Sequence, residues 1–361
     1  LLLPVAEGLG LARLPEPSPG DVFLDLEGAR FARDGGREYL FGICNRLRAD
    51  YKSWWAHDDA TERAAFEAVI DHVMEAWAAH PGLHIYHFGH YEPSTFKRLM
   101  GRHATRADEL DRLLRAERFV DLHAVVRQAL RAGVESYSIK QLEQFYEFAR
   151  AVPLDDASAH MQAIELALES HAPAAIPEVS RAAVQAYNED DCRSTAALRD
   201  WLERLRSELV ASGVAVPRPR AKAAEPPPAV SDLEAAELAA SERLLAGLPP
   251  EASAPGHPQH PRWLLAHLVG WHRREHKAQY WEQYRLNDLA DEDLVEEGAA
   301  IAGLQFVERL EAVVNAKTGR ATGSVIDRYT YPAQECEIGR DGELLMRGDD
   351  RAVPFGAIVA L

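Results

Sequence analysis

The sequence contains few cysteines and no long apolar segment. Its three cysteines, Cys44, Cys192 and Cys336, are odd in number and far apart, so they predict neither a disulfide framework nor a zinc or iron–sulfur cluster. No apolar run approaches the length that spans a bilayer, and no signal peptide is visible. We therefore expect a cytoplasmic protein with no membrane partner.

Acidic side chains outnumber basic ones in the sequence. Lysine and arginine together number 40 and aspartate and glutamate 57, which gives a formal net charge of −17 at pH 7. Nonspecific binding to nucleic acid depends on neutralising phosphates with basic side chains, so this charge argues against a protein that coats nucleic acid. It does not exclude an enzyme that meets phosphate through a bound metal ion. Any basic groove must be local or belong to missing parts of the chain.

The sequence also lacks a Walker A loop. No G-x-x-x-x-G-K-[ST] motif occurs, so no ATPase site is expected within these residues. An apolar content of 47% is enough for a sizeable core, and 361 residues predict two or three domains. The chain starts with LLLPVAEGLG, without methionine, and stops in the apolar run AIVAL. Both ends lead us to expect a fragment of a longer protein.

Composition and periodicity divide the sequence into four segments. We expect a connector over residues 1–20, an α/β domain over 21–208, a Pro- and Ala-rich linker with a short helix over 209–261, and a helix with a small β-rich module over 262–361. In the last segment, apolar residues at helical spacing predict one amphipathic helix over Arg262–Tyr284.

Local patterns within residues 21–208 predict strands first and helices afterwards, which is typical of a mixed sheet covered by helices. Apolar runs rich in strand-forming residues predict strands over Val22–Leu26, Glu38–Asn45, Tyr51–Ala56 and Leu83–Phe88. Apolar residues at helical spacing predict helices, the longest of them over Thr61–His80 and Ser180–Glu208.

Two carboxylates interrupt the first predicted strand, in the stretch DVFLDLEG. Residues two apart on a strand point to the same face, so Asp25 and Glu27 would lie side by side. Like charges that close raise each other's pKa, and a divalent cation removes this cost because hard cations prefer carboxylate oxygens. The pattern indicates a Mg²⁺ or Mn²⁺ site, and the alternative is the solvated polar face of an edge strand.

Two later segments offer further acids. Glu92 follows a predicted strand and precedes a helix, where open α/β sheets bind ligands, although it could equally complement the helix dipole. Tyr187 and Asp191, in AYNEDDC, are four residues apart in a predicted helix and share one face. Asp191 would complete an acidic metal site with the Tyr187 hydroxyl beside it. The alternative is a helix with a solvated acidic face.

In this order along the chain, the motifs resemble the tyrosine-bearing branch of the DEDD exonuclease superfamily. Closer still is the resemblance to the ribonuclease H-like nuclease domain of YprB-like proteins and to RecB-like nucleases fused ahead of a superfamily 1 helicase. It rests on the stretches FLDLEG, EYLFGI, HIYHFGHYEPSTFKRLMGRH, RAERFVDLHAVVRQAL, ESYSIKQLEQFY and AYNEDDCRSTAALRDWL, which cover roughly Asp21–Leu205. The resemblance implies a ribonuclease H-like mixed sheet flanked by helices. Residues Arg262–Leu361 are similar to the region between nuclease domain and helicase core in those proteins.

The resemblance also implies a ligand set. Asp25, Glu27, Glu92 and Asp191 would hold two divalent ions, Mg²⁺ or Mn²⁺, and Tyr187 would be the catalytic tyrosine. Relatives usually read Asn-Gly-x-x-Phe-Asp at the second motif, where this sequence has YHFGHYE and places Glu92 at the position of the aspartate. A glutamate can ligate a divalent ion but reaches further by one methylene.

Two more positions have counterparts in the family. Lys140, in YSIKQL, resembles a Ser-Leu-Lys element and could meet a substrate phosphate, although an exposed surface lysine is the alternative. Asp121, in FVDLHAVV, resembles an aspartate that is common after the second motif, and we expect it to have a supporting or structural role.

The implied activity is a divalent-metal-dependent 3′→5′ exonuclease. It would hydrolyse phosphodiesters at single-stranded 3′ ends by a two-metal mechanism, on DNA in preference to RNA. A helicase domain in the same or a longer chain is the expected partner. Two alternatives stay open. One is a catalytically weak module that binds nucleic acid and positions a helicase, and the other is a structure-specific endonuclease with the same fold.

Overall fold

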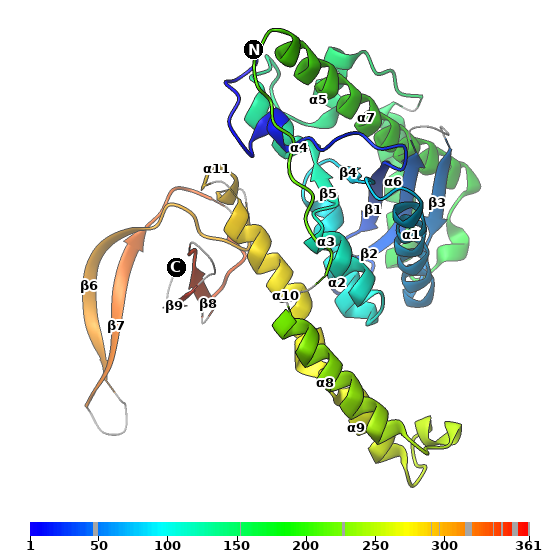
Figure 1. Ribbon diagram of the computed structural model, residues 1–361, viewed down its shortest axis with the longest axis vertical. Coiled ribbons are helices and arrows are strands. Elements are labelled where there is room, and N and C mark those ends of the chain that lie inside the picture. Colours follow the sequence, from blue (N-terminus) through cyan, green and yellow to red (C-terminus); the bar gives the residue numbers. More distant parts are fainter. Residues whose placement is uncertain are drawn as a thin grey trace. The chain divides into compact units, whose positions relative to one another are not determined.

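The computed structural model of the chain describes most of its residues (Figure 1). The described residues are 1–45, 50–151, 153–225, 228–289, 291–295, 297–314, 320–334, 336–340, 342–348 and 353–359. They divide into two units, Leu1–Arg274 and Glu275–Leu361. The four-segment organisation expected from composition stays a prediction.

A five-stranded mixed sheet forms the centre of the first unit. Its order is β3–β2–β1–β4–β5, in which β1, β2 and β3 pair antiparallel while β4 runs parallel to β1 and β5 parallel to β4. The strands are β1 Val22–Ala29, β2 Arg37–Asn45, β3 Tyr51–Trp55, β4 Ile85–His87 and β5 Phe119–Asp121. Helices flank this sheet (Figure 1). The predicted fold class, an α/β mixed sheet flanked by helices, is confirmed.

The sequence of β1 suits its central place in the sheet. Val22, Phe23 and Leu24 are almost completely buried, as expected for a strand with helices on both faces. The turn that leads to β2 contains Gly35 and Gly36 at φ values of +73° and +71°, a region that other residues rarely adopt. This turn brings β2 back antiparallel to β1.

Helices surround the sheet along residues 59–211. They are α1 Asp59–Ala79, α2 Tyr91–His103, α3 Ala107–Arg115, α4 Leu122–Ala129, α5 Ile139–Tyr146, α6 Leu154–Glu169 and α7 Glu178–Ala211, with short 3₁₀ turns at Gly10–Arg13 and Pro173–Ala175. A capping box of Asp58 and Thr61 begins α1, and the Ser138 side chain caps α5. The two longest predicted helices correspond to α1 and α7.

Helix α7 packs against β1 and β2, and its Arg199 side chain is buried in the core. Arg199 Nη1 donates to Asp21 Oδ2 over 2.7 Å, and both side chains are fully buried. The guanidinium carbon of Arg199 lies 5.0 Å from the ring centroid of Phe23 and 4.9 Å from that of Tyr86. The ion pair therefore anchors the middle of α7 to the start of β1.

The predicted single helix over Arg262–Tyr284 is wrong. Two helices occupy this segment, α9 His260–Leu268 and α10 Trp271–Asp288. They are separated at Gly270, whose φ of +69° lies in the left-handed region, where a helix cannot continue. Helix α8, Pro228–Leu245, packs against α9 and lies within residues 209–261, where a short helix was expected. A 3₁₀ turn lies at Pro250–Ser253.

The second unit contains the β-rich module expected near the end of the chain. Its elements are helix α11 Asp291–Leu294 and strands β6 Gln305–Val314, β7 Ala321–Thr330, β8 Glu343–Met346 and β9 Val353–Ala357. Each successive pair of strands forms its own two-stranded antiparallel sheet. None of the helices described is long and apolar enough to cross a bilayer.

Candidate functional site

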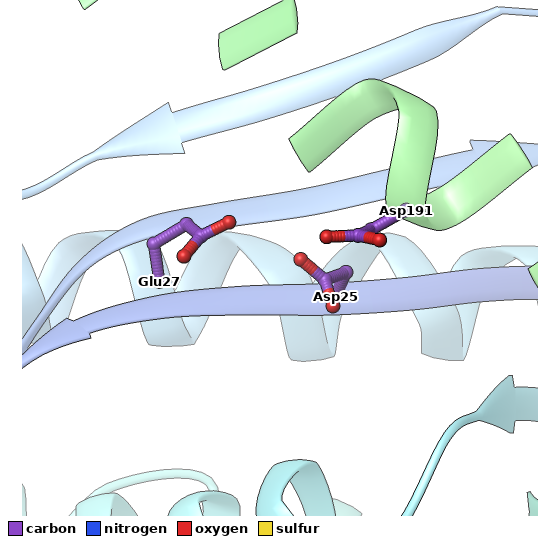
Figure 2. A group of neighbouring side chains, drawn as sticks. All are labelled: Asp25, Glu27 and Asp191. Atoms are coloured by element: carbon purple, nitrogen blue, oxygen red, sulfur yellow. The ribbon is translucent and has the colours of Figure 1, made fainter. Parts of the chain in front are cut away.

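Acids from the central strand and from α7 meet on one face of the sheet. Asp25 and Glu27 project from β1 toward the same side, and Asp191 reaches them from α7 (Figure 2). One carboxylate oxygen of each residue lies within 4.8 Å of the others. Glu27 and Asp191 are buried, and Asp25 is partly buried. The structure therefore brings together three of the four acids that the resemblance assigns to metal binding.

A glycine in β2 lets α7 approach this closely. Gly42 pairs with Asp25 in the sheet, and a Cβ atom at Gly42 would lie 1.7 Å from Asn188 Oδ1 of α7. Asn188 uses the space, since its Nδ2 donates to Asp25 Oδ2 over 2.7 Å and its Oδ1 accepts the Tyr51 hydroxyl over 2.7 Å. The close contact of helix and sheet thus holds one carboxylate of the group in place.

Burial and mutual repulsion disfavour the ionised acids. Burial raises the pKa of Asp25 well above its usual range, and the charges of Asp191 and Glu27 raise it further. For Glu27, burial followed by the charge of Asp191 raises the pKa to about 8. A divalent cation among the three carboxylates would offset this repulsion. The donor set, carboxylate oxygens on adjacent elements, fits a hard ion such as Mg²⁺ or Mn²⁺.

Glu92 lies near the three carboxylates but outside their group. It occupies the first turn of α2, directly after the loop that follows β4, and is 4% exposed. Burial is the main cause that raises its pKa well above the usual range, and the charge of Asp191 contributes. Its Oε2 is buried without a hydrogen bond, at 3.7 Å from His87 Nδ1. The metal-ligand role expected for Glu92 stays a prediction.

Asp121 has a local structural role. Its Oδ1 accepts the backbone N–H of His123 at the start of α4 and that of Gly89, over 2.8 Å and 2.9 Å. Asp121 therefore caps α4 and holds the loop that leads to Glu92.

Sequence comparison assigns this domain to a family. A family model described as the RNase H superfamily matches residues 22–203, just over half of the chain. The chain belongs to the RNase H superfamily. Comparisons with curated proteins and with solved structures give no significant match. The matched residues begin at β1 and end within α7, so the RNase H-like domain contains all three carboxylates.

Membership supports a general function for the RNase H-like domain. Enzymes of this superfamily are nucleases that bind nucleic acid and use divalent metal ions, and the three carboxylates provide a place for such ions. The chain therefore contains a nuclease domain at this general level. Its substrate, polarity and specific metal ion belong to the proposal that follows from the site.

Tyr187 and Lys140 lie beside Asp191, and the roles expected for them stay predictions. Tyr187 is 4% exposed and lies one helical turn before Asp191. Lys140 Nζ, from α5, is 3.6 Å from Asp191 Oδ2 and 5.2 Å from the centroid of the Tyr187 ring. Burial raises the pKa of Tyr187, and the charge of Asp191 adds to this effect. The tyrosine hydroxyl therefore keeps its proton at neutral pH.

Sequence reasoning missed two residues of this site. Asn188 is three positions before Asp191 on the helix, so helical spacing could have placed it on the same face. Arg150 lies in the loop between α5 and α6, and its Nη2 donates to Asp191 Oδ1 over 2.6 Å. No periodic signal marks Arg150, because its position depends on the fold of the loop.

Proposed function

We propose that the RNase H-like domain is a metal-dependent 3′→5′ exonuclease of the tyrosine-bearing DEDD type. Its substrate is the 3′ end of a single strand, DNA in preference to RNA. The observation that carries this proposal is the group of Asp25, Glu27 and Asp191 with Tyr187 one helical turn away. Two buried acids and a partly buried one at this spacing suit a divalent ion better than any role in packing, since they repel one another without one.

The roles of the residues follow from their positions. Bound divalent ions would supply Lewis acidity that activates water and stabilises charge on the reacting phosphate. Asp25, Glu27 and Asp191 hold these ions, and Asn188 orients Asp25 through its hydrogen bond. Tyr187 orients the attacking water through its hydroxyl and does not act as a strong base, because it stays protonated. The product is a nucleoside 5′-monophosphate.

Glu92 is the fourth ligand in this proposal. Its burial and its unpaired Oε2 support a carboxylate that awaits a cation, since a buried acceptor without a partner is unfavourable. The charge of Glu92 also raises the pKa of Asp25, which is consistent with a short separation between the two acids.

A second candidate is a catalytically weak module that binds nucleic acid and positions a helicase. The observation in its favour is that Glu92 lies outside the group of three acids while Lys140 and Arg150 both pair with Asp191. In either case we propose that the domain acts with a helicase in the same or a longer chain, as its resemblance implies.

The test is cleavage of 5′-labelled single-stranded DNA and RNA of matched sequence, with Mn²⁺ and with EDTA. We expect a Mn²⁺-dependent ladder that shortens from the 3′ end for the wild type and no ladder for Asp191→Asn. Glu189→Gln is the matched control, since it removes a carboxylate from the same helix where Glu189 pairs with Arg193 outside the group of acids. A circular substrate distinguishes an endonuclease, which alone would cut it. Binding without cleavage in any metal would support the second candidate.

A further inference from the structure

Arg150 carries a donor that the fold leaves unused beside the carboxylates. Its Nε and Nη2 donate to the two oxygens of Glu143, over 3.0 Å and 2.6 Å, and Nη2 also donates to Asp191 Oδ1 over 2.6 Å. Its Nη1 is buried without a hydrogen-bond partner, and the side chain as a whole is 10% exposed. A buried cation with an unpaired donor is unfavourable unless a further acceptor joins it.

The guanidinium is held in position by groups that do not bind metal. Glu143 accepts the Ser194 hydroxyl over 2.7 Å, and the Tyr146 hydroxyl lies 2.9 Å from the same Ser194 oxygen. The backbone N–H of the next residue, Ala151, donates to Asp190 Oδ2 over 2.8 Å. The loop of Arg150 is therefore fastened to both α5 and α7.

Arg150 can give up its contact with Asp191 and still keep its ion pair with Glu143. The bidentate pair with Glu143 uses Nε and Nη2, whereas Asp191 shares Nη2 with Glu143. The guanidinium carbon also lies 5.3 Å from the centroid of the Tyr187 ring, next to the residue proposed to orient water. Arg150 thus stays near Tyr187 whether or not it donates to Asp191.

We propose that Arg150 binds a phosphate of the nucleic-acid substrate at the carboxylate centre, and that its contact with Asp191 is exchanged for that phosphate. This inference rests on the proposed function. A phosphate that approaches three carboxylates needs a cation beside it, and a guanidinium offers several donors in a planar fork. Asp191, once released from Arg150, has its Oδ1 available for a metal ion, while Oδ2 stays near Lys140. Glu143 is a positioning residue, because it acts through Arg150.

The test measures DNA binding and metal binding separately in the full chain. A fluorescein-labelled single strand is titrated in Ca²⁺, a probe for binding without turnover, at several salt concentrations. For Arg150→Met we expect affinity to fall about tenfold or more and the slope of log K against log salt to decrease by roughly 0.7, the value for one phosphate contact to a single strand. Mn²⁺ affinity without nucleic acid, followed by electron paramagnetic resonance, should equal or exceed that of the wild type, because a competing cation is gone. Arg193→Met, on the outer face of α7, should change neither quantity.

Glu143→Gln provides an independent variant that keeps the cation. Removal of a negative charge near a phosphate site should by itself tighten binding. Weaker binding of the single strand by Glu143→Gln, with an unchanged salt slope, therefore supports the role of Glu143 in positioning Arg150. Tighter or equal binding overturns that role.

Three further outcomes would overturn the proposed role of Arg150. Equal affinity and slope for Arg150→Met and wild type, with wild-type binding intact, refutes the role of Arg150 and leaves the nuclease proposal standing. A loss of Mn²⁺ affinity in Arg150→Met with no change in salt slope shows that Arg150 only positions Asp191 for the metal ion and does not bind phosphate. Absence of wild-type binding to DNA and RNA overturns both this inference and the proposed function.

Discussion

Glu27→Gln tests the claim that the acidic group destabilises the metal-free protein. The pKa of Glu27 in the folded state is raised to about 8 from an ordinary value of 4.5, first by burial and then by Asp191. Folding therefore favours the protonated carboxyl. The stabilising contribution is complete below about pH 4.5 and is lost as the pH rises toward 8. Glutamine has no proton to lose, so the variant escapes this loss.

The size of the effect follows from the shift. One pKa unit corresponds to about 1.4 kcal/mol, so a shift from 4.5 to about 8 removes about 3 to 4 kcal/mol of stability between pH 5 and pH 8. We predict that in EDTA the free energy of unfolding of the wild type falls by that much more than that of Glu27→Gln over this range. A divalent ion at a hundredfold excess over Kd should restore about 2.7 kcal/mol of the wild-type stability at pH 8, and less than that of Glu27→Gln.

Urea denaturation at pH 5 and pH 8, with and without Mn²⁺, measures both effects. A short pulse of hydrogen–deuterium exchange at each urea concentration, read on peptides that contain β1, assigns the transition to the RNase H-like domain in the full chain. Parallel pH dependences for wild type and Glu27→Gln in EDTA would refute the electrostatic reasoning. Equal stabilisation of both proteins by Mn²⁺ would refute the place of Glu27 among the metal ligands.

Two further predictions concern the contacts that position the acids. Arg199→Met leaves Asp21 buried without its cation and should lower the free energy of unfolding by about 3 to 5 kcal/mol, which thermal melting would detect. A melting temperature within about 2 °C of wild type corresponds to a far smaller loss and would contradict this prediction. Gly42→Ala should displace Asn188 and weaken Mn²⁺ binding measured by titration, because the added Cβ would lie 1.7 Å from the Asn188 amide oxygen. Gly82→Ala is its control, since that Cβ meets nothing closer than 3.6 Å, and equal Mn²⁺ affinities in the two variants would count against the role of Gly42.

The acidic net charge of the chain is compatible with a nuclease site. A net charge of −17 argued that any basic groove is local or belongs to missing parts of the chain, and two cations lie near the carboxylates of the candidate site. Lys140 and Arg150 both lie within ion-pair distance of Asp191. These two cations lie beside a carboxylate of the candidate site, and their position does not depend on the composition of the whole surface.

Backbone geometry made part of the site predictable from the sequence. The two-residue repeat of a strand places Asp25 and Glu27 on one face wherever the strand lies, and the turn of a helix does the same for Tyr187 and Asp191. The order of strands before helices likewise predicted the α/β class. These features are local, because each depends only on dihedral angles that neighbouring residues share.

Contacts between distant segments required the tertiary structure. Asp191 meets Asp25 because α7 crosses β2 at Gly42, where the missing side chain admits Asn188. Arg150 reaches Asp191 because a loop is fastened to α5 and α7 by side chains with no periodic pattern. The break before α10 was also missed, since Gly270 fits a helical pattern until its φ is known. The sequence by itself determined which faces carry the acids, and only packing decided which faces meet, because packing depends on the shapes and partners of side chains far apart in the chain.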